Sequence, residues 1–174
     1  MDYQIKPFTE AQLPEILEIF NDAILNSTCM YEYKPRNLQV MKDWYADKVK
    51  GNYPLIGLFN QQGALLGFGT YGPFRVRPAY KYTVEHSVYV RADMRGKGYG
   101  KILLKEIIEC AIKQDYHTIV AGIDADNKTS IILHEKLGFE FAGNIKQAGF
   151  KFNRWLDLAF YQIVLKTPAN PVAE

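Results

Sequence analysis

The spacing of apolar side chains along the first third of the chain predicts a strand and two helices. Residues 3–8 alternate like a short strand, and a helix follows with Thr9 as its N-cap and Gln12 as its capping-box partner. One face of that helix is apolar and consists of Leu13, Ile16, Leu17, Phe20 and Ile24. A loop then separates it from a second predicted helix over residues 38–49, with Gly51 just past its end.

The remaining pattern predicts more strands than helices. Strands are expected over residues 53–59, 64–74, 83–90, 118–124, 139–142 and 156–165, the first two joined by a turn at Gln62-Gly63. Helices are expected over residues 102–112 and 128–136. This alternation predicts an α/β or α+β sandwich. We expect one domain over residues 1–166 and a flexible C-terminal tail over residues 167–174, which is polar and contains proline.

Composition narrows the class of protein. The 174 residues suffice for one domain with a substantial core, and 48% hydrophobic with 23% charged residues is ordinary for a globular protein. A net charge of +2 is too small to indicate nucleic-acid binding, and no 18-residue apolar run predicts a membrane span. Cys29 and Cys110 belong to no Cys/His cluster. We therefore expect reduced thiols, a cytoplasmic location and no metal.

The segment "RGKGYG" stands between a predicted strand and a predicted helix. Its glycines, Gly96, Gly98 and Gly100, allow a ligand to approach the backbone, and the first N–H groups of a helix attract anions. The Walker pattern is absent, and the spacing GxGxG differs from the dinucleotide fingerprint GxGxxG. A phosphate-binding loop and a plain glycine-rich turn both fit these residues.

With Arg95 as its first residue, the segment fits the pattern R-x-x-G-x-G. This pattern resembles the acyl-CoA-binding signature of the GNAT acetyltransferase superfamily. "DADNKTSIILHEKLGF", about 30 residues further on, resembles the second half of that signature. "TVEHSVYV", "LHEKLGF" and "AGFKFNRWLDLAFYQ" look like the phosphinothricin and methionine sulfone/sulfoximine N-acetyltransferases within it. The resemblance implies the GNAT fold, a central mixed and mostly antiparallel twisted sheet flanked by helices.

The resemblance also implies how acetyl-CoA would bind. The backbone of Val88, Tyr89 and Val90 would pair with the pantetheine arm as an added strand. The pyrophosphate would lie on the loop formed by Arg95, Gly96, Lys97, Gly98, Tyr99, Gly100 and Lys101. Asn127 would hydrogen-bond the CoA near its pantetheine end, although it could equally serve only as the N-cap of the next helix.

Two residues are candidates for catalysis. Glu85 lies in a strand that is otherwise apolar or hydroxylic, and the resemblance implies that it deprotonates the amine. A carboxylate paired with Lys81 or Arg91 is the alternative. Much of the superfamily has a tyrosine as the acid that protonates the thiolate, whereas "LHEKLGF" has His134 there. Histidine could donate the proton, or it could only pack and hydrogen-bond.

The acceptor site is expected near the same strand. Arg75 and Arg77, on either side of Val76, could hold a carboxylate or phosphinate, or could belong to a solvated loop. The resemblance places His86 and Ser87 with Glu85 at the substrate. Tyr31 and Glu32 lie in a loop that this superfamily often uses for acceptor contacts.

These inferences predict an enzyme that transfers acetyl from acetyl-CoA to the α-amine of a small amino acid or analogue. Another amine, such as a protein N-terminus, is an alternative acceptor, and a non-catalytic acyl-CoA-binding module is an alternative function. Neither nucleic acid nor membrane is expected as a partner. Because relatives are commonly homodimers, a homodimer is expected.

Overall fold

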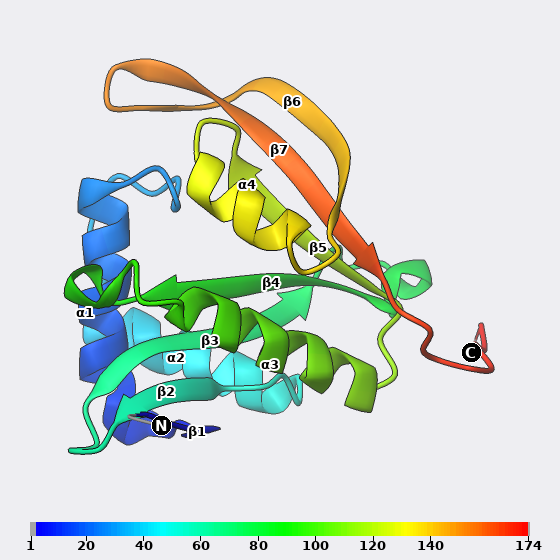
Figure 1. The fold of residues 1–174 in the computed structure, drawn as a ribbon, viewed down its shortest axis with the longest axis horizontal. Coiled ribbons are helices and arrows are strands. Elements are labelled where there is room, and N and C mark those ends of the chain that lie inside the picture. The colour runs from blue at the N-terminus through cyan, green and yellow to red at the C-terminus, as the bar shows by residue number, and fades with distance from the viewer. Residues whose placement is uncertain (1–2, 174) are drawn as a thin grey trace. The chain divides into compact units, whose positions relative to one another are not determined.

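A computed structural model describes residues 3–173, in which seven strands and four α-helices alternate (Figure 1). The strands are β1 (Tyr3–Pro7), β2 (Ile56–Asn60), β3 (Leu65–Pro73), β4 (Thr83–Val90), β5 (Thr118–Asp124), β6 (Glu140–Lys151) and β7 (Arg154–Val164). The helices are α1 (Leu13–Asn26), α2 (Leu38–Lys50), α3 (Tyr99–Lys113) and α4 (Lys128–Glu135). The strands follow the order β1-β2-β3-β4-β5-β7-β6, with β4 and β5 parallel. This mixed, mostly antiparallel sheet confirms the predicted fold class.

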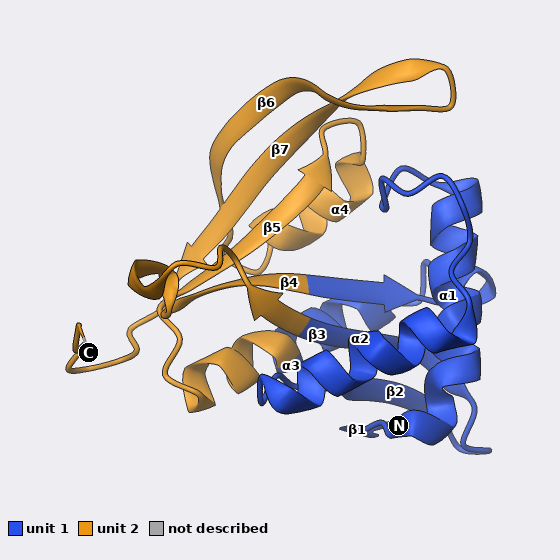
Figure 2. Ribbon diagram, turned by 180° about the vertical axis from the view of Figure 1, so that it is seen from behind, with its two compact units in different colours: residues 1–70, 87–106 blue, residues 71–86, 107–174 orange. Residues whose placement is uncertain are grey.

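The chain forms two compact units, which share three elements (Figure 2). Within the described residues, the first unit comprises residues 3–70 and 87–106, and the second comprises residues 71–86 and 107–173. β3, β4 and α3 each begin in one unit and end in the other. The prediction of a single domain over residues 1–166 stays a prediction.

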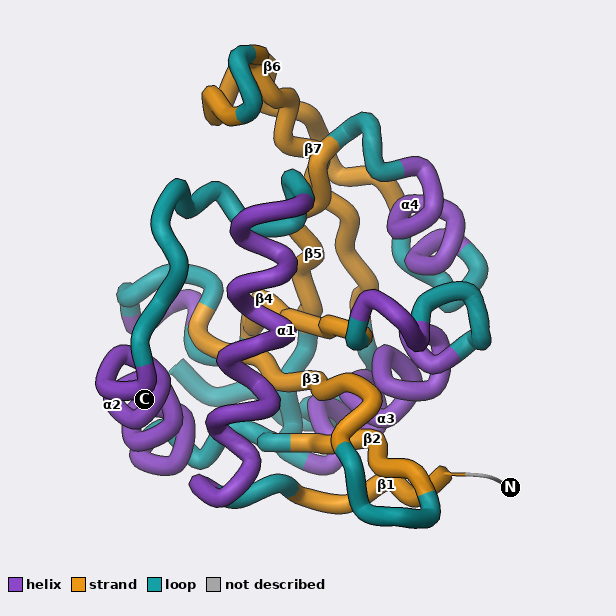
Figure 3. The backbone as a smooth tube through the Cα atoms, turned by 90° about the vertical axis from the view of Figure 1, so that its left-hand side faces the viewer, coloured by secondary structure: helices purple, strands orange, loops and turns teal. Residues whose placement is uncertain are grey.

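The first unit has an aromatic core under two helices. α1 and α2 lie next to each other beside the strands (Figure 3), and α1 buries Leu13, Ile16 and Phe20. The ring of Phe20 packs edge-on against Phe68 and Tyr89, with centroids 5.1 Å away in each case. Such edge-to-face contacts add to the stabilisation from burial. The core therefore fixes β3 and the end of β4 beneath α1.

The second unit is built on the strands β5, β7 and β6. Alternate residues of β5, Ile119, Ala121 and Ile123, are buried, whereas Gly122 between them is exposed. α4 lies against one face of β5 (Figure 1), and its His134 is buried there. The opposite face of β5, which carries Gly122, has no helix of this unit over it (Figure 2).

The element predictions hold best where the apolar periodicity is strong. The capping box of Thr9 and Gln12, the α2 helix with Gly51 as its C-cap, and the bounds of β4 and β5 are confirmed. The turn at Gln62-Gly63 is also present, with Gly63 at φ 82°.

Three boundary predictions are wrong. The strand expected over residues 53–59 is β2, which begins only at Ile56. The strand expected over residues 139–142 is β6, which extends to Lys151. Its residues are largely exposed and its register shifts twice, at Phe141/Gly143 and Ile145/Gly149, so no regular alternation marks it. The third helix begins at Tyr99 rather than at residue 102. The prediction placed Gly100 in the glycine-rich loop, whereas Gly100 lies in the first turn of the helix.

The last residues are hydrogen-bonded to the second unit. Thr167 Oγ1 donates to the carbonyl of Tyr116 at 2.6 Å, and the N–H of Val172 donates to Tyr82 Oη at 3.1 Å. Lys81 Nζ donates to the carbonyl of Ala173 at 3.0 Å. The flexibility of residues 167–174 stays a prediction.

Candidate functional site

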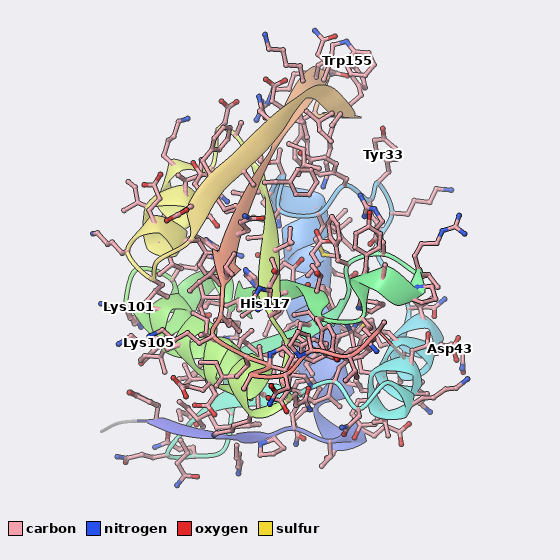
Figure 4. The ribbon with its side chains drawn as sticks, turned by 90° about the vertical axis from the view of Figure 1, so that its right-hand side faces the viewer. Tyr33, Asp43, Lys101, Lys105, His117 and Trp155 are labelled. Atoms are coloured by element: carbon pink, nitrogen blue, oxygen red, sulfur yellow. The ribbon has the colours of Figure 1, made fainter. Side chains whose placement is uncertain are left out.

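The glycine loop of the first unit has a backbone that requires glycine. Gly96 and Gly98 lie at φ 79° and 82°, in the left-handed region that side chains disfavour. A Cβ at either position would have no heavy atom within 4 Å, so the space beside the loop is open. α3 begins directly afterwards, and Lys101 and Lys105 extend from it (Figure 4). An open loop, a helix N-terminus and cationic side chains together form an arrangement that suits a phosphate group.

Arg95 connects this loop to its surroundings. Its Nη2 lies 2.7 Å from Asp22 Oδ2 of α1, and its Nε donates to the carbonyl of Val90 at 3.2 Å. Half of the side chain remains exposed. In the absence of ligand, Arg95 therefore links the loop to α1 and to the end of β4. Its contact with acetyl-CoA stays a prediction.

The end of β4 lies unusually close to β3. A Cβ at Gly67 of β3 would lie 2.6 Å from the carbonyl oxygen of Tyr89 and 3.1 Å from Cα of Val90. Gly67 is therefore required for this approach. The ring of Tyr89 is packed in the aromatic core, whereas Val88 and Val90 are half-buried. The core-strand interpretation is confirmed for Tyr89 only, and backbone pairing of the three residues with pantetheine stays a prediction.

Glu85 lies on the face of the second unit that no helix of the unit covers. Gly122 on β5 makes room for it, since a Cβ there would lie 3.0 Å from Glu85 Oε1. Burial raises the pKa of Glu85, and the Arg75 guanidinium partly opposes the shift. A carboxyl group with a raised pKa is suited to accept a proton near neutral pH. Sequence reasoning found Glu85 but missed Gly122, whose only signal was a glycine inside the buried run "TIVAGID".

The predicted residues His86 and His134 form a hydrogen-bonded pair on the face covered by α4. His134 Nδ1 lies 2.7 Å from the carbonyl oxygen of Ser130, so this nitrogen carries the proton. His134 Nε2 then has a lone pair, and His86 Nε2, 2.9 Å away, must donate to it. His86 Nδ1 is consequently an acceptor; it is buried and has no hydrogen-bond partner among residues 3–173.

Both histidines are uncharged at neutral pH. Burial, with a smaller effect of His134, lowers the pKa of His86 to about 3. Burial also lowers the pKa of His134, against the opposing hydrogen bond to Ser130. The single N–H of His134 is bonded to the Ser130 carbonyl and its Nε2 accepts from His86, which favours the interpretation that it packs and hydrogen-bonds. Its role as an acid stays a prediction.

Asn127 is the N-cap of α4. Its Oδ1 accepts a hydrogen bond from the N–H of Ser130 at 3.1 Å, which satisfies one of the first donors of the helix. The capping interpretation is confirmed. A contact with CoA would have to come in addition to this bond, and it stays a prediction.

The predicted acceptor residues differ in their surroundings. Arg75 is exposed, lies over the ring of Phe74 at 4.4 Å and is the cation that acts on Glu85. Arg77 is exposed, as is Val76, whose exposed fraction is 92%. Of the two arginines, Arg75 is therefore the one whose charge acts on Glu85.

The other three predicted acceptor residues belong to the first unit. Glu32 forms an ion pair with Arg36, whose Nε donates to Glu32 Oε2 at 3.0 Å, so its charge is already compensated. Tyr31 is partly exposed, and Ser87 is half-buried on β4, two residues beyond Glu85. Their contacts with substrate stay predictions.

Residues 3–173 contain no group of three or more His, Cys, Asp or Glu side chains able to hold a metal ion. Within the same residues, no helix is both long and apolar enough to cross a membrane.

Comparisons with known proteins agree with the geometry. A family model described as "Acetyltransferase (GNAT) domain" matches residues 5–160. The L-methionine sulfoximine/L-methionine sulfone acetyltransferase of Pseudomonas aeruginosa is 43% identical over 95% of this chain and 96% of its own. An N-acetyltransferase from Staphylococcus aureus Mu50 superposes with a TM-score of 0.92 at 44% identity, over 94% of this chain and 99% of its own.

A third relative was solved with the acetyl donor. The GNAT superfamily phosphinothricin acetyltransferase of Sinorhizobium meliloti, in complex with acetyl-CoA, has a TM-score of 0.94 at 34% identity. The match covers 98% of this chain and 93% of that one. The family match, the relatives and the glycine loop lead to one conclusion: this chain belongs to the GNAT family of acetyltransferases.

Proposed function

We propose that the protein transfers the acetyl group of acetyl-CoA to the α-amine of a small amino acid or analogue, such as methionine sulfone, methionine sulfoximine or phosphinothricin. The observation that carries the proposal is Glu85, a carboxyl group whose pKa burial raises and the charge of Arg75 lowers, on a face that no helix of the second unit covers. The same strand continues into Val88–Val90 and the glycine loop. Relatives named for these acceptors support the choice.

Acetyl-CoA supplies an activated thioester, and the chain offers groups that suit its parts. The open backbone at Gly96 and Gly98, with Lys101 nearby, suits the pyrophosphate. The backbone of Val88–Val90 suits the amides of the pantetheine arm. Asn127 is a candidate for a further contact. A backbone N–H of β4, such as that of Val90, is the proposed donor to the oxyanion.

Glu85 is the proposed general base. An amino acid is an ammonium ion at neutral pH, and it must lose a proton before its nitrogen can attack the thioester carbon. Glu85 accepts this proton, and the amine nitrogen attacks the thioester carbon to form the new C–N bond. The tetrahedral adduct loses its second proton from nitrogen to solvent water, and the C–S bond breaks to release CoA thiolate. Because the His86–His134 pair directs no N–H outward, we assign no general acid, and the thiolate leaves as such.

Arg75 is the proposed determinant of substrate class. A guanidinium binds a carboxylate with charge-assisted hydrogen bonds, worth roughly 1.5–3 kcal/mol. Val76 and Arg77 would border the acceptor, with Tyr31, Glu32, His86 and Ser87 as further candidate contacts. An amino acid offers both the amine for Glu85 and the carboxylate for Arg75. A polyamine offers no anion for Arg75 to bind.

The test compares matched acceptors by the rate of CoA release. Wild-type enzyme should acetylate methionine sulfone well and its carboxyl-amidated form at least ~10-fold less efficiently, as one lost charge-assisted bond predicts. Arg75→Ala should raise KM for the acid and shrink that difference, whereas Arg77→Ala, the matched control, should change it less. Equal efficiency for acid and amide in the wild type would rule out the contact between Arg75 and the carboxylate. A higher efficiency with a peptide N-terminus or a polyamine would show that small amino acids are not the acceptors.

We also propose that the protein is a cytoplasmic homodimer whose subunits meet through the β6–β7 hairpin. This hairpin exposes large apolar side chains, with exposed fractions from 45% to 61%, at Phe141, Ile145, Phe150, Phe152 and Trp155. Trp155 projects from its end (Figure 4). Clustered apolar side chains at a surface are typical of protein interfaces. Light scattering should give a dimer mass for the wild type and a monomer for Trp155→Lys; a monomeric wild type would contradict the proposal.

A further inference from the structure

Asp124 is a buried carboxylate that the proposed reaction does not yet use. It is the last residue of β5, and only 2% of its side chain is exposed. Removing a carboxylate from water costs several kcal/mol unless hydrogen bonds and counter-charges compensate it. A buried Asp at this position therefore needs partners for both of its oxygens.

The structure supplies partners for one oxygen only. Oδ1 accepts a hydrogen bond from the N–H of Asp126 at 3.1 Å. Oδ2 has no hydrogen-bond partner among the described residues, and the nearest cation, Arg154 Nη2, is 3.5 Å from it. The closer contact of Arg154 is to Asp126, whose Oδ2 is 2.8 Å from Nη1. The carboxylate of Asp124 is thus incompletely compensated, and its Oδ2 lacks an N–H donor.

Asp124 lies on the same face of β5 as the catalytic candidate. Side chains alternate along a strand, so residues 122 and 124 share a face, and Glu85 Oε1 lies beside residue 122. The opposite residues on β7, Phe160 and Leu158, border the same face. Residues 122 and 124 lie about 7 Å apart along the strand. Gly122 is exposed on this face, with the carboxyl group of Glu85 beside it and the carboxylate of Asp124 two residues further along the strand.

We propose that Asp124 binds the α-ammonium group of the acceptor, as a second carboxylate next to Glu85. This inference rests on the proposed function. The two carboxylates have separate tasks: Asp124 Oδ2 accepts one N–H of the bound amine and orients it, and Glu85 takes the proton that must leave. The amine keeps an N–H for Asp124 after this transfer, while its lone pair is free to attack. Arg75 holds the other end of the same zwitterion.

The test separates recognition of the ammonium group from effects on folding. Methionine sulfone is compared with its α-hydroxy acid analogue, which keeps the carboxylate and lacks the ammonium group and serves as a competitive inhibitor. Asp124→Asn should raise KM and the dissociation constant of the amino acid by about 10- to 100-fold, as loss of a hydrogen bond between charged groups predicts. The inhibition constant of the hydroxy acid and the KM of acetyl-CoA should stay within about twofold.

Arg154→Met is the matched control, because it removes the cation near Asp124 but keeps the carboxylate. It should retain the preference for the amino acid over the hydroxy acid. If Asp124→Asn weakens both ligands equally, its role is structural, and if it weakens neither, water satisfies Oδ2; either result overturns the inference. Should Asp124→Asn not fold, Asp124→Glu shifts the carboxylate by one methylene, and an unchanged preference would overturn it too. A wild type that neither binds nor acetylates amino acids refutes the proposed function itself, and the inference with it.

Discussion

At the scale of single residues, the candidate site depends on which face of β4 each side chain occupies. β4 alternates between a face under α4, with His86, and the opposite face, with Glu85. Adjacent residues therefore perform unrelated tasks: His86 joins a buried neutral pair, and Glu85 lies beside Gly122 with a raised pKa. The sequence identified both residues. Their separation onto two faces follows from the predicted strand, because neighbouring side chains of a strand alternate. The space that Gly122 leaves depends on pairing with β5 and could not be predicted.

Glu85→Gln keeps the shape of the side chain and removes the base. We expect kcat/KM for the acceptor to fall by ~10²-fold or more near neutral pH, as positioned general bases contribute about that much. Part of the rate should return at higher pH, where more of the acceptor is free amine. A pH–rate profile of both enzymes measures this. An unchanged rate at neutral pH would make Glu85 a structural carboxylate.

The buried histidines predict a loss of stability in acid. The pKa of His86 in the folded protein is about 3, below the ~6.5 of the unfolded chain, so only the unfolded state takes up the proton in between. The stabilisation is complete above pH ~6.5 and falls by about 1.4 kcal/mol per pH unit below it for each such histidine.

Urea unfolding at several pH values tests this, with His86→Gln as the comparison. The variant lacks one of the two titrations, so its free energy of unfolding should decline less steeply than that of the wild type between pH ~4.5 and ~6.5. Other groups, including Glu85, contribute equally to both proteins and cancel. Parallel declines would show that His86 is protonated in the folded state.

At the scale of elements, the glycine loop and the N-terminus of α3 form the proposed site for the pyrophosphate. Its two left-handed glycines and the following helix were expected from "RGKGYG", because strand, glycines and helix are local features of sequence. The long β6–β7 hairpin was not, because its bulged and exposed strands lack a regular apolar period. The hairpin depends on the pairing of β7 with the distant strand β5, and the spacing of apolar residues within the hairpin does not predict such pairing.

Gly98→Asp tests the loop. The change places a side chain at a positive φ and a negative charge in the open space beside the backbone. Calorimetry should show at least ~100-fold weaker binding of CoA, since repulsion and strain both oppose the pyrophosphate. Lys105→Ala, on α3 outside the loop, is the control and should lose much less. Unchanged affinity in folded Gly98→Asp would contradict the assignment.

At the scale of the whole molecule, β4 belongs to both units. Its first half carries Glu85 and His86 in the second unit, and its second half leads to Val88–Val90 and the glycine loop in the first. One continuous strand thus carries the proposed acceptor chemistry and the proposed donor site. The motifs at residues 95–101 and 127 imply this organisation through the family resemblance, and the roles of their residues stay predictions. Asp124 was missed because a single buried Asp carries no spacing signal.

The most direct test of this account is turnover by the purified wild-type protein. With acetyl-CoA and methionine sulfone, methionine sulfoximine or phosphinothricin, we expect release of CoA and an equal amount of N-acetylated amino acid, identified by mass spectrometry. Omitting the acceptor should abolish the release. If CoA is released with none of these acids above the rate without acceptor, while acetyl-CoA still binds, the protein does not acetylate amino acids of this class and the central claim is wrong.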